Sequence, residues 1–293
     1  MSTRLLVRRI ALVVLAGTLA CAAAMAHAQP AQKTDKPDGV DVGKPSALRN
    51  LVPADRLERA AAQQYAAIKR DAAAKRALAP DNHPQLIRLR TISQRVIANA
   101  GRFHPQAQKW AWEVNLIGSQ QLNAFCMPGG KIVFYSGIID RLQLTDDEIA
   151  MIMGHEVAHA LREHARERVA KSELTRLGVT IVGSLVGDGR YGQAFDLGGA
   201  LLSMKFSRDD ETEADLIGME LAARGGFDPR AGVSLWQKMG RAAQGAPPPW
   251  LSTHPSSPNR VKQIERHMSQ VLPLYERARV AAPASANAAS ATR

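Results

Sequence analysis

The chain has 293 residues, of which 45% are hydrophobic and 22% are charged, and its formal net charge is +11. This composition is ordinary for a globular protein, and it excludes a wholly disordered chain, a collagen-like chain and a polytopic membrane protein. Two cysteines are too few for a scaffold held by disulfides.

The first 28 residues have the three parts of a secretory signal peptide. Three arginines precede an apolar stretch from Ile10 to Met25, and Ala26 and Ala28 place small residues at the −3 and −1 positions of a cleavage site. The apolar stretch is shorter than the roughly 20 residues of a membrane-spanning helix. We therefore expect a periplasmic protein that begins at Gln29.

A second export route centres on Cys21. The residues Thr18 to Cys21 partly resemble a bacterial lipobox, which would make the protein an outer-membrane lipoprotein. By either route Cys21 cannot pair with Cys126, because the cysteine is either removed or lipidated. The sequence therefore predicts no internal disulfide in the exported chain.

The surface charge remains basic after export, since loss of the three N-terminal arginines lowers the net charge from +11 to +8. A basic surface on an exported protein favours peripheral association with an anionic membrane. The chain has no nucleic-acid-binding motif with interleaved aromatic residues, so we expect no nucleic-acid partner.

Composition divides the rest of the chain into three parts. Residues 29–50 are rich in Pro, Gly, Asp and Lys without an apolar period, which predicts a disordered linker. Residues 51–275 form the expected folded domain. The Ala- and Ser-rich residues 276–293 are expected to form a disordered tail.

The folded domain is predicted to be α+β and mostly helical, with a small antiparallel sheet. Apolar residues at helical spacing predict two helices, at residues 53–78 and 83–100. Alternating apolar and polar residues predict three short strands, at 110–117, 122–127 and 131–135. Helices follow, and Thr145 with Glu148 forms a capping box that begins a helix expected to extend to about Ala170.

An H-E-x-x-H motif, from His155 to His159, lies within that helix. Residues four apart share a helical face, so both imidazoles can reach one Zn²⁺, and Glu156 is placed to act as the general base. A catalytic zinc has three protein ligands. His164 lies about 140° from His159 on a continuous helix, so we expect it to face solvent or to pack elsewhere.

Acidic residues of a later helix, predicted over 209–224, offer the third ligand. Glu211 and Asp215 lie four apart on one face, so one can ligate the metal while the other binds a ligand imidazole. The alternative is an acidic first turn that complements the helix dipole. Glu213 lies about 200° from Glu211 and is expected to point away.

The motifs together resemble metallopeptidase family forty-eight, which includes the CAAX prenyl proteases, the HtpX-type membrane proteases and soluble periplasmic enzymes such as BepA. The resemblance covers about residues 85–270. The matching segments are Asn123 to Lys131, His155 to His159, Ser207 to Asp215, Gly226 to Pro229, and Thr253 to Pro255 with Arg260. It implies a gluzincin fold with one Zn²⁺ per chain, Glu211 as third ligand and Asp215 as its hydrogen-bonded partner.

The resemblance also implies roles outside the ligand set. His254 approaches the zinc, either as a fourth ligand in a resting state or as a donor to the transition state. Arg260 stabilises the oxyanion, or alternatively forms a salt bridge between its helix and the body of the domain. Asn123, Ala124 and Phe125 form an edge strand with which an extended substrate pairs.

These features predict a zinc-dependent endopeptidase that hydrolyses peptide bonds of envelope proteins, with unfolded or extended polypeptides as substrates. The resemblance implies a role in protein quality control. The soluble periplasmic branch fits better than the membrane members, because the only long apolar run lies in the expected signal peptide. The alternative is a chaperone-like periplasmic binding protein with a latent protease site.

Overall fold

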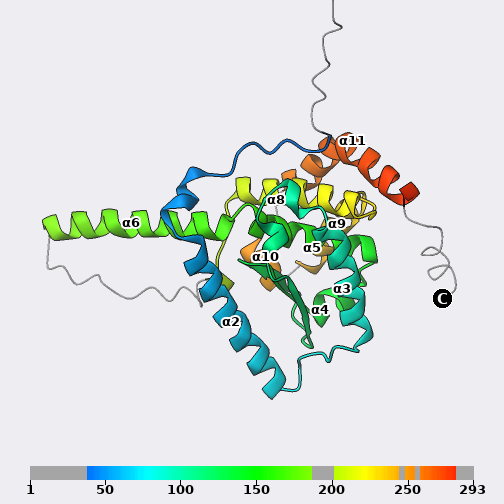
Figure 1. The fold of residues 1–293 in the computed structure, drawn as a ribbon, viewed down its shortest axis with the longest axis horizontal. Helices are drawn as coiled ribbons and strands as arrows, with labels where there is room; N and C mark the ends of the chain where they lie inside the picture. The colour runs from blue at the N-terminus through cyan, green and yellow to red at the C-terminus, as the bar shows by residue number, and fades with distance from the viewer. Residues whose placement is uncertain (1–37, 187–200, 244–247, 255–257, 282–293) are drawn as a thin grey trace, which may run out of the picture. The chain divides into compact units, whose positions relative to one another are not determined.

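Helices form most of this protein, in a computed structural model that describes residues 38–186, 201–243, 248–254 and 258–281. The predicted signal peptide, with Cys21, lies outside these residues. The helices that we refer to are α2 (Ala54–Ala74), α3 (Pro84–Ile97), α4 (Ser136–Leu142), α5 (Asp146–Leu161), α6 (His164–Val186), α8 (Arg208–Arg224), α9 (Ala231–Ala242), α10 (Pro249–Thr253) and α11 (Pro258–Ala281). The predicted mostly helical α+β class is confirmed (Figure 1).

The small sheet is mixed and has the strand order β1 (Glu113–Ile117), β3 (Lys131–Tyr135), β2 (Ala124–Met127). Gly129 and Gly130 take positive φ angles of 78° and 80°, and they reverse the chain so that β2 and β3 pair antiparallel. β3 then lies between β2 and β1 and runs parallel to β1. The expected antiparallel sheet is therefore correct for the hairpin of β2 and β3 and wrong for β1, because β1 pairs with the second strand of the hairpin, β3, which runs in the same direction.

α5 and α8 pack against each other through glycines. A Cβ atom on Gly154 would lie 2.5 Å from the carbonyl oxygen of Gly218, and one on Gly218 would lie 2.6 Å from the backbone nitrogen of His155. Only residues without a side chain allow this approach. Figure 1 shows α8 between α5 and α11. The close approach of Gly154 and Gly218 places the face of α5 that carries His155 directly against α8.

α5 ends earlier than the helical pattern predicted. It begins as expected at the capping box of Thr145 and Glu148, but it ends at Leu161 and α6 begins at His164. Between the two helices Glu163 takes a left-handed conformation with φ of 57°. Its carboxylate pairs with Arg49 at 3.1 Å and Arg166 at 2.7 Å, which stabilises this turn. The predicted continuation to Ala170 is therefore wrong.

An N-terminal strap, residues 39–52, packs on the helical body where we expected a disordered linker. The amide of Val40 donates to the carboxylate of Glu220 at 2.6 Å, and Val40 is 5% exposed. Gly39 has φ of 105°, and a Cβ atom there would overlap the Glu220 carboxylate. The buried charge of Glu220 thus fixes the strap, and the linker prediction fails for these residues.

The C-terminal helix also exceeds its expected length, since α11 continues past residue 275 to Ala281. Residues 282–293 of the predicted tail lie outside the described part of the chain. Within that part, none of the helices has the length and apolar character that crossing a membrane requires.

Candidate metal centre

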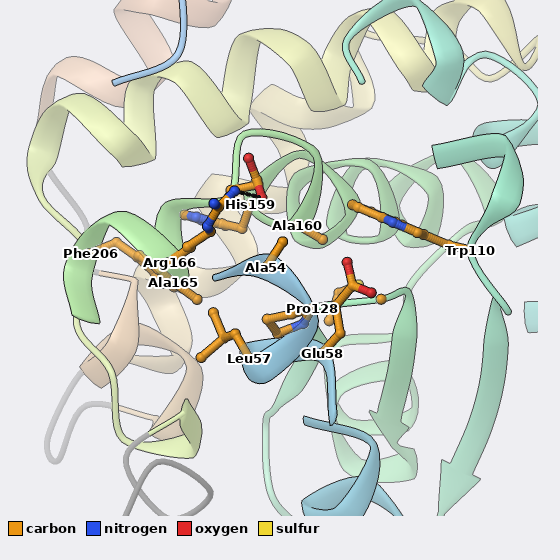
Figure 2. A pocket seen from close by; sticks show the side chains of 13 residues that line it. Ala54, Leu57, Glu58, Trp110, Pro128, His159, Ala160, Ala165, Arg166 and Phe206 are labelled. Carbon is orange, nitrogen blue, oxygen red and sulfur yellow. Dashed lines mark hydrogen bonds and ion pairs between the residues drawn. The ribbon is translucent and has the colours of Figure 1, made fainter. Parts of the chain in front are cut away.

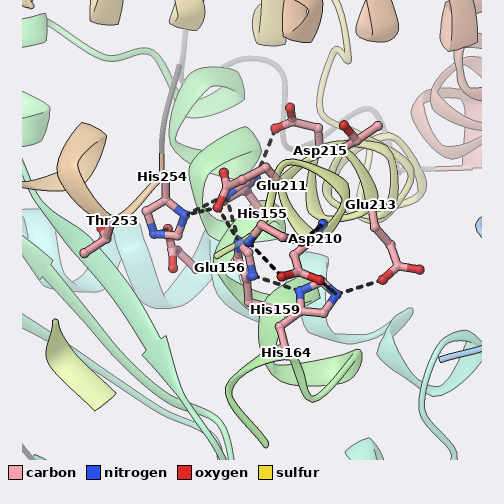
Figure 3. Close-up of polar contacts among 12 residues, drawn as sticks. His155, Glu156, His159, His164, Asp210, Glu211, Glu213, Asp215, Thr253 and His254 are labelled. Atoms are coloured by element: carbon pink, nitrogen blue, oxygen red, sulfur yellow. Dashed lines mark hydrogen bonds and ion pairs between the residues drawn. The ribbon is translucent and has the colours of Figure 1, made fainter. Parts of the chain in front are cut away.

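Four buried side chains meet between α5, α8 and α10 (Figure 3). His155 and His159 come from α5, Glu211 from the first turn of α8, and His254 from the C-terminal end of α10. One nitrogen or oxygen atom of each lies within 4.8 Å of the others. The structure therefore gathers the three residues expected as ligands, together with the histidine expected to approach the metal.

The separations within this cluster fit a tetrahedral zinc ion. Nε2 of His155 lies 3.1 Å from Nε2 of His159, 3.5 Å from Oε2 of Glu211 and 3.2 Å from Nδ1 of His254. Tetrahedral ligands at about 2.0–2.1 Å from zinc are about 3.3 Å from one another. Imidazole nitrogen and carboxylate oxygen are ligands that zinc commonly takes. The cluster thus has both the spacing and the chemistry for this ion.

The ring of His155 is held from its far side by an ion pair. Nδ1 of His155 lies 3.0 Å from Oδ1 of Asp215, and the guanidinium of Arg260 donates to both Asp215 oxygens at 2.6 Å. The Nδ1 contact directs Nε2 of His155 toward the cluster. Asp215 therefore occupies the place expected of the hydrogen-bonded partner, with its role in metal binding still a prediction.

Electrostatics favour ionised carboxylates in this cluster. Burial opposes ionisation of Asp215, but the Arg260 guanidinium holds its pKa below the usual range. Burial likewise opposes ionisation of Glu211, and His155 and His254 hold its pKa well below the usual range. Burial lowers the pKa of His155, but hydrogen bonds with Asp215 and Glu211 raise it to about 9.

His159 has the opposite preference, because burial and the neighbouring His155 hold its pKa well below the usual range. A neutral imidazole has a lone pair available for a metal. The described groups therefore include a neutral ring and a carboxylate facing the same point.

Arg260 lies behind the ligands and does not face the cleft. Besides its contacts with Asp215, its Nη1 donates to Oε2 of Glu211 at 2.7 Å, and its guanidinium lies 3.8 Å from the ring centre of Trp236. This is the salt-bridge alternative considered from the sequence. To meet an oxyanion the guanidinium would have to leave two buried carboxylates, so the geometry gives no support to the catalytic role.

Glu156, the expected general base, is 2% exposed beside the cluster. The indole N–H of Trp250 donates to its Oε1 at 2.8 Å, and Nε2 of His254 lies 3.4 Å from the same atom. Sequence reasoning missed Trp250. The available signal is its position four residues before His254, which places both side chains on one face of a short helix.

His164 is buried beside His159, contrary to the expectation that it faces solvent or packs elsewhere. Its Nδ1 lies 2.9 Å from Nδ1 of His159, and its Nε2 lies 2.7 Å from Oε2 of Glu213. The angular argument failed because α5 is not continuous to residue 164. Glu213 does point away from Glu211, as expected, and its carboxylate reaches His164 (Figure 3).

A cleft of about 150 Å³ extends from the cluster along β2. Among the described strands β2 pairs with β3 alone, so it is an edge strand. The cleft is lined by Asn123, Ala124 and Phe125, the residues expected to contact substrate, and by Glu156 and His254.

A smaller cavity of about 30 Å³ adjoins this cleft, with His159 and Phe206 in the lining of both, and lies between the start of α2 and the start of α6 (Figure 2). Most of its lining is apolar and includes Leu57, Trp110, Pro128 and Phe206.

Comparison with known proteins gives a family match. The profile of Peptidase family M48 matches residues 85–268. The chain is 34% identical to the mitochondrial metalloendopeptidase OMA1 of Arabidopsis thaliana over 167 residues, which cover 56% of this chain and 34% of the relative.

Two bacterial proteins are also similar. The chain is 29% identical to the metalloprotease LoiP of Escherichia coli over 67% of this chain and 75% of LoiP. It is 29% identical to the beta-barrel assembly-enhancing protease of Yersinia pestis over 63% of this chain and 39% of that protein. The chain thus spans about a third of the plant relative and three quarters of LoiP.

Proposed function

The chain belongs to peptidase family M48, and from this premise we propose that it is a zinc-dependent endopeptidase. The observation that carries the proposal is Glu156, a buried carboxylate next to a cluster with the spacing of zinc ligands. The bacterial and mitochondrial relatives named as metalloproteases support the same activity.

Each residue of the centre has a distinct task in this proposal. His155, His159 and Glu211 would hold one Zn²⁺, which when bound supplies a Lewis acid that polarises the scissile carbonyl. Glu156 takes a proton from the attacking water and later passes it to the leaving amine. The indole of Trp250 holds one oxygen of Glu156, so the other oxygen is available for the proton.

The cleft supports an extended polypeptide as the substrate. A substrate strand that pairs with the edge of β2 forms backbone hydrogen bonds regardless of its sequence. Such pairing requires an unfolded or extended segment, and it places the backbone of the segment beside Glu156 and the cluster. We therefore propose unfolded polypeptides as the substrate class, and no nucleic-acid partner.

We place this activity in the bacterial periplasm, in quality control of envelope proteins. The name of the Yersinia pestis relative, which refers to assembly of β-barrels, supports an envelope role, whereas the OMA1 relatives are named as mitochondrial. The intact mass of the purified exported protein tests the export route. A chain beginning at Gln29 agrees with secretion, and a lipidated Cys21 would instead show an outer-membrane lipoprotein.

A cleavage assay with Glu156→Gln tests the peptidase function. The purified protein is incubated with casein or a reduced, unfolded protein, and zinc content is measured in parallel. We expect the wild-type protein to cleave and the variant to bind zinc equally well while losing at least about 100-fold in rate, as expected for loss of a general base. Equal rates would reject Glu156 as the base.

The presence of His254 in the cluster favours a second candidate, a chaperone-like protein with a latent site. A wild-type protein that binds zinc, suppresses aggregation of an unfolded protein and leaves it intact would support this candidate. Suppression that is equal in Glu156→Gln would show that it does not depend on cleavage.

A further inference from the structure

His159 is held from its far side by a relay that ends on a charged pair. Its Nε2 faces the cluster, 3.1 Å from Nε2 of His155, which leaves Nδ1 for a second contact. That contact is Nδ1 of His164 at 2.9 Å. The far nitrogen of His155 contacts a carboxylate, that of Asp215, directly. The far nitrogen of His159 is linked to a carboxylate through a second imidazole, because Nε2 of His164 lies 2.7 Å from Oε2 of Glu213.

The carboxylate at the end of the relay determines where the hydrogens lie. A carboxylate only accepts, so Nε2 of His164 must carry a hydrogen and donate it to Glu213. In a neutral imidazole the other nitrogen then accepts, so Nδ1 of His164 accepts from Nδ1–H of His159. His159 is thereby set in the tautomer that has no hydrogen on Nε2. That is the form whose lone pair faces the cluster.

The relay is buried and fixed at its outer end. His164 is 2% exposed, and the ring of Phe206 stacks on His159 with a centroid distance of 4.1 Å. Arg162 pairs with Glu213 and also donates to the carbonyl oxygen of Gly43 in the N-terminal strap at 3.2 Å. The break in the helix at Glu163 is what turns His164 back toward His159.

From these contacts we propose that His164 is a positioning residue for the metal centre, with Glu213 as its partner. It fixes the ring orientation and tautomer of His159 so that Nε2 is ready to bind a divalent cation of the zinc type. The inference rests on the proposed metal function of His155, His159 and Glu211. Partners of this kind typically change metal affinity 10- to 100-fold when they are removed.

The test measures Zn²⁺ affinity by competition with a chromophoric chelator, together with the visible spectrum of the Co²⁺-loaded protein. His164→Phe keeps a ring of similar size but has no acceptor, so we expect affinity about 10- to 100-fold weaker and a changed Co²⁺ spectrum. His164→Asn offers an amide oxygen near the position of Nδ1, so it should recover most of the affinity.

Two further variants make the result specific. Glu213→Ala removes the last acceptor at a position whose side chain is 19% exposed, and we expect about a ten-fold loss of affinity. Glu167→Gln is the matched control, because Glu167 is a carboxylate on the same helix as His164, 13% exposed, that pairs with Lys171 and lies outside the relay. It should bind zinc as the wild-type protein does.

His164→Phe and Glu213→Ala both within about two-fold of wild-type affinity would overturn the proposal, as would equal losses in Glu167→Gln. If His164→Phe does not fold, as judged by circular dichroism without metal, Glu213→Ala and His164→Asn decide the question. Failure of the wild-type protein to bind zinc more tightly than Glu211→Ala would instead reject the metal centre itself. The two failures are therefore distinguishable.

Discussion

The indole N–H of Trp250 donates a hydrogen bond to Oε1 of Glu156, with 2.8 Å between nitrogen and oxygen. Both residues are almost fully buried, at 1% and 2% exposure. The contact restrains the orientation of the Glu156 carboxylate beside the cluster. It also ties α10, the short helix that ends at His254, to the centre of α5.

We expect Trp250→Phe to lower kcat about five-fold, since a hydrogen bond contributes about 1 kcal/mol and each 1.4 kcal/mol is a factor of ten in rate. Zinc content should stay unchanged, because Trp250 does not belong to the ligand cluster. Trp236→Phe is the control, since its ring packs on Trp250 with 5.4 Å between ring centres and phenylalanine keeps an aromatic ring over Arg260. Equal rate losses in both variants would assign the effect to packing.

His254→Ala is expected to raise basal proteolysis or self-cleavage while zinc stays bound. Nδ1 of His254 lies 3.0 Å from Oε1 of Glu211 and 3.2 Å from Nε2 of His155, and its ring lines the cleft together with Glu156, so it can take the metal position that the attacking water needs. A donor to the transition state would instead give a fall of about 10²–10³ in rate. Rates measured at constant zinc content, with His267→Ala as the control histidine, separate these outcomes.

Removal of the metal should lower the unfolding temperature of the wild-type protein and leave that of Glu211→Ala nearly unchanged. A ligand present at about 1,000 times its dissociation constant stabilises the folded state by about 4 kcal/mol. Glu211→Ala loses this stabilisation by bound metal, because the carboxylate ligand is absent. Thermal unfolding with and without EDTA measures the difference. Glu167→Ala, a carboxylate on α6 paired with Lys171, should respond to EDTA as the wild-type protein does.

Gly218→Ala should destabilise the fold by about 1–3 kcal/mol, because its methyl group would overlap the backbone at His155. Gly240→Ala provides a matched control in α9, where a methyl group would meet no atom within 4 Å. There the exchange should stabilise the helix by about 0.5–1 kcal/mol. Denaturant unfolding of the zinc-free proteins gives both values, and a neutral Gly218→Ala would contradict the close packing of α5 and α8.

Local patterns predicted the parts of the centre that lie within single helices. The spacing of His155 and His159 places them on one face of α5, and the spacing of Glu211 and Asp215 does the same on α8. Each of these predictions needs only the helical period. Even the outward direction of Glu213 followed from that period.

The missing parts depend on contacts between distant segments. Nothing in Leu161 to His164 marks a helix end, since the segment has no Gly or Pro; the turn is stabilised by Arg49, more than a hundred residues earlier. Likewise the direction of β1 depends on β3, and the order of the N-terminal strap depends on Glu220. Contacts between residues far apart in the chain determine these features, so local sequence patterns cannot predict them.

The contact between Gly154 and Gly218 has a consequence for the size of the ion that the centre accepts. Because the two backbones already touch, α5 and α8 cannot move closer to suit a smaller ion. Their separation is a property of the main chain, whereas the reach of each imidazole or carboxylate depends on its rotamer. The side chains must therefore rotate to accommodate ions of different radius. Selectivity among divalent ions then depends on the contacts that restrict the rotation of each ring.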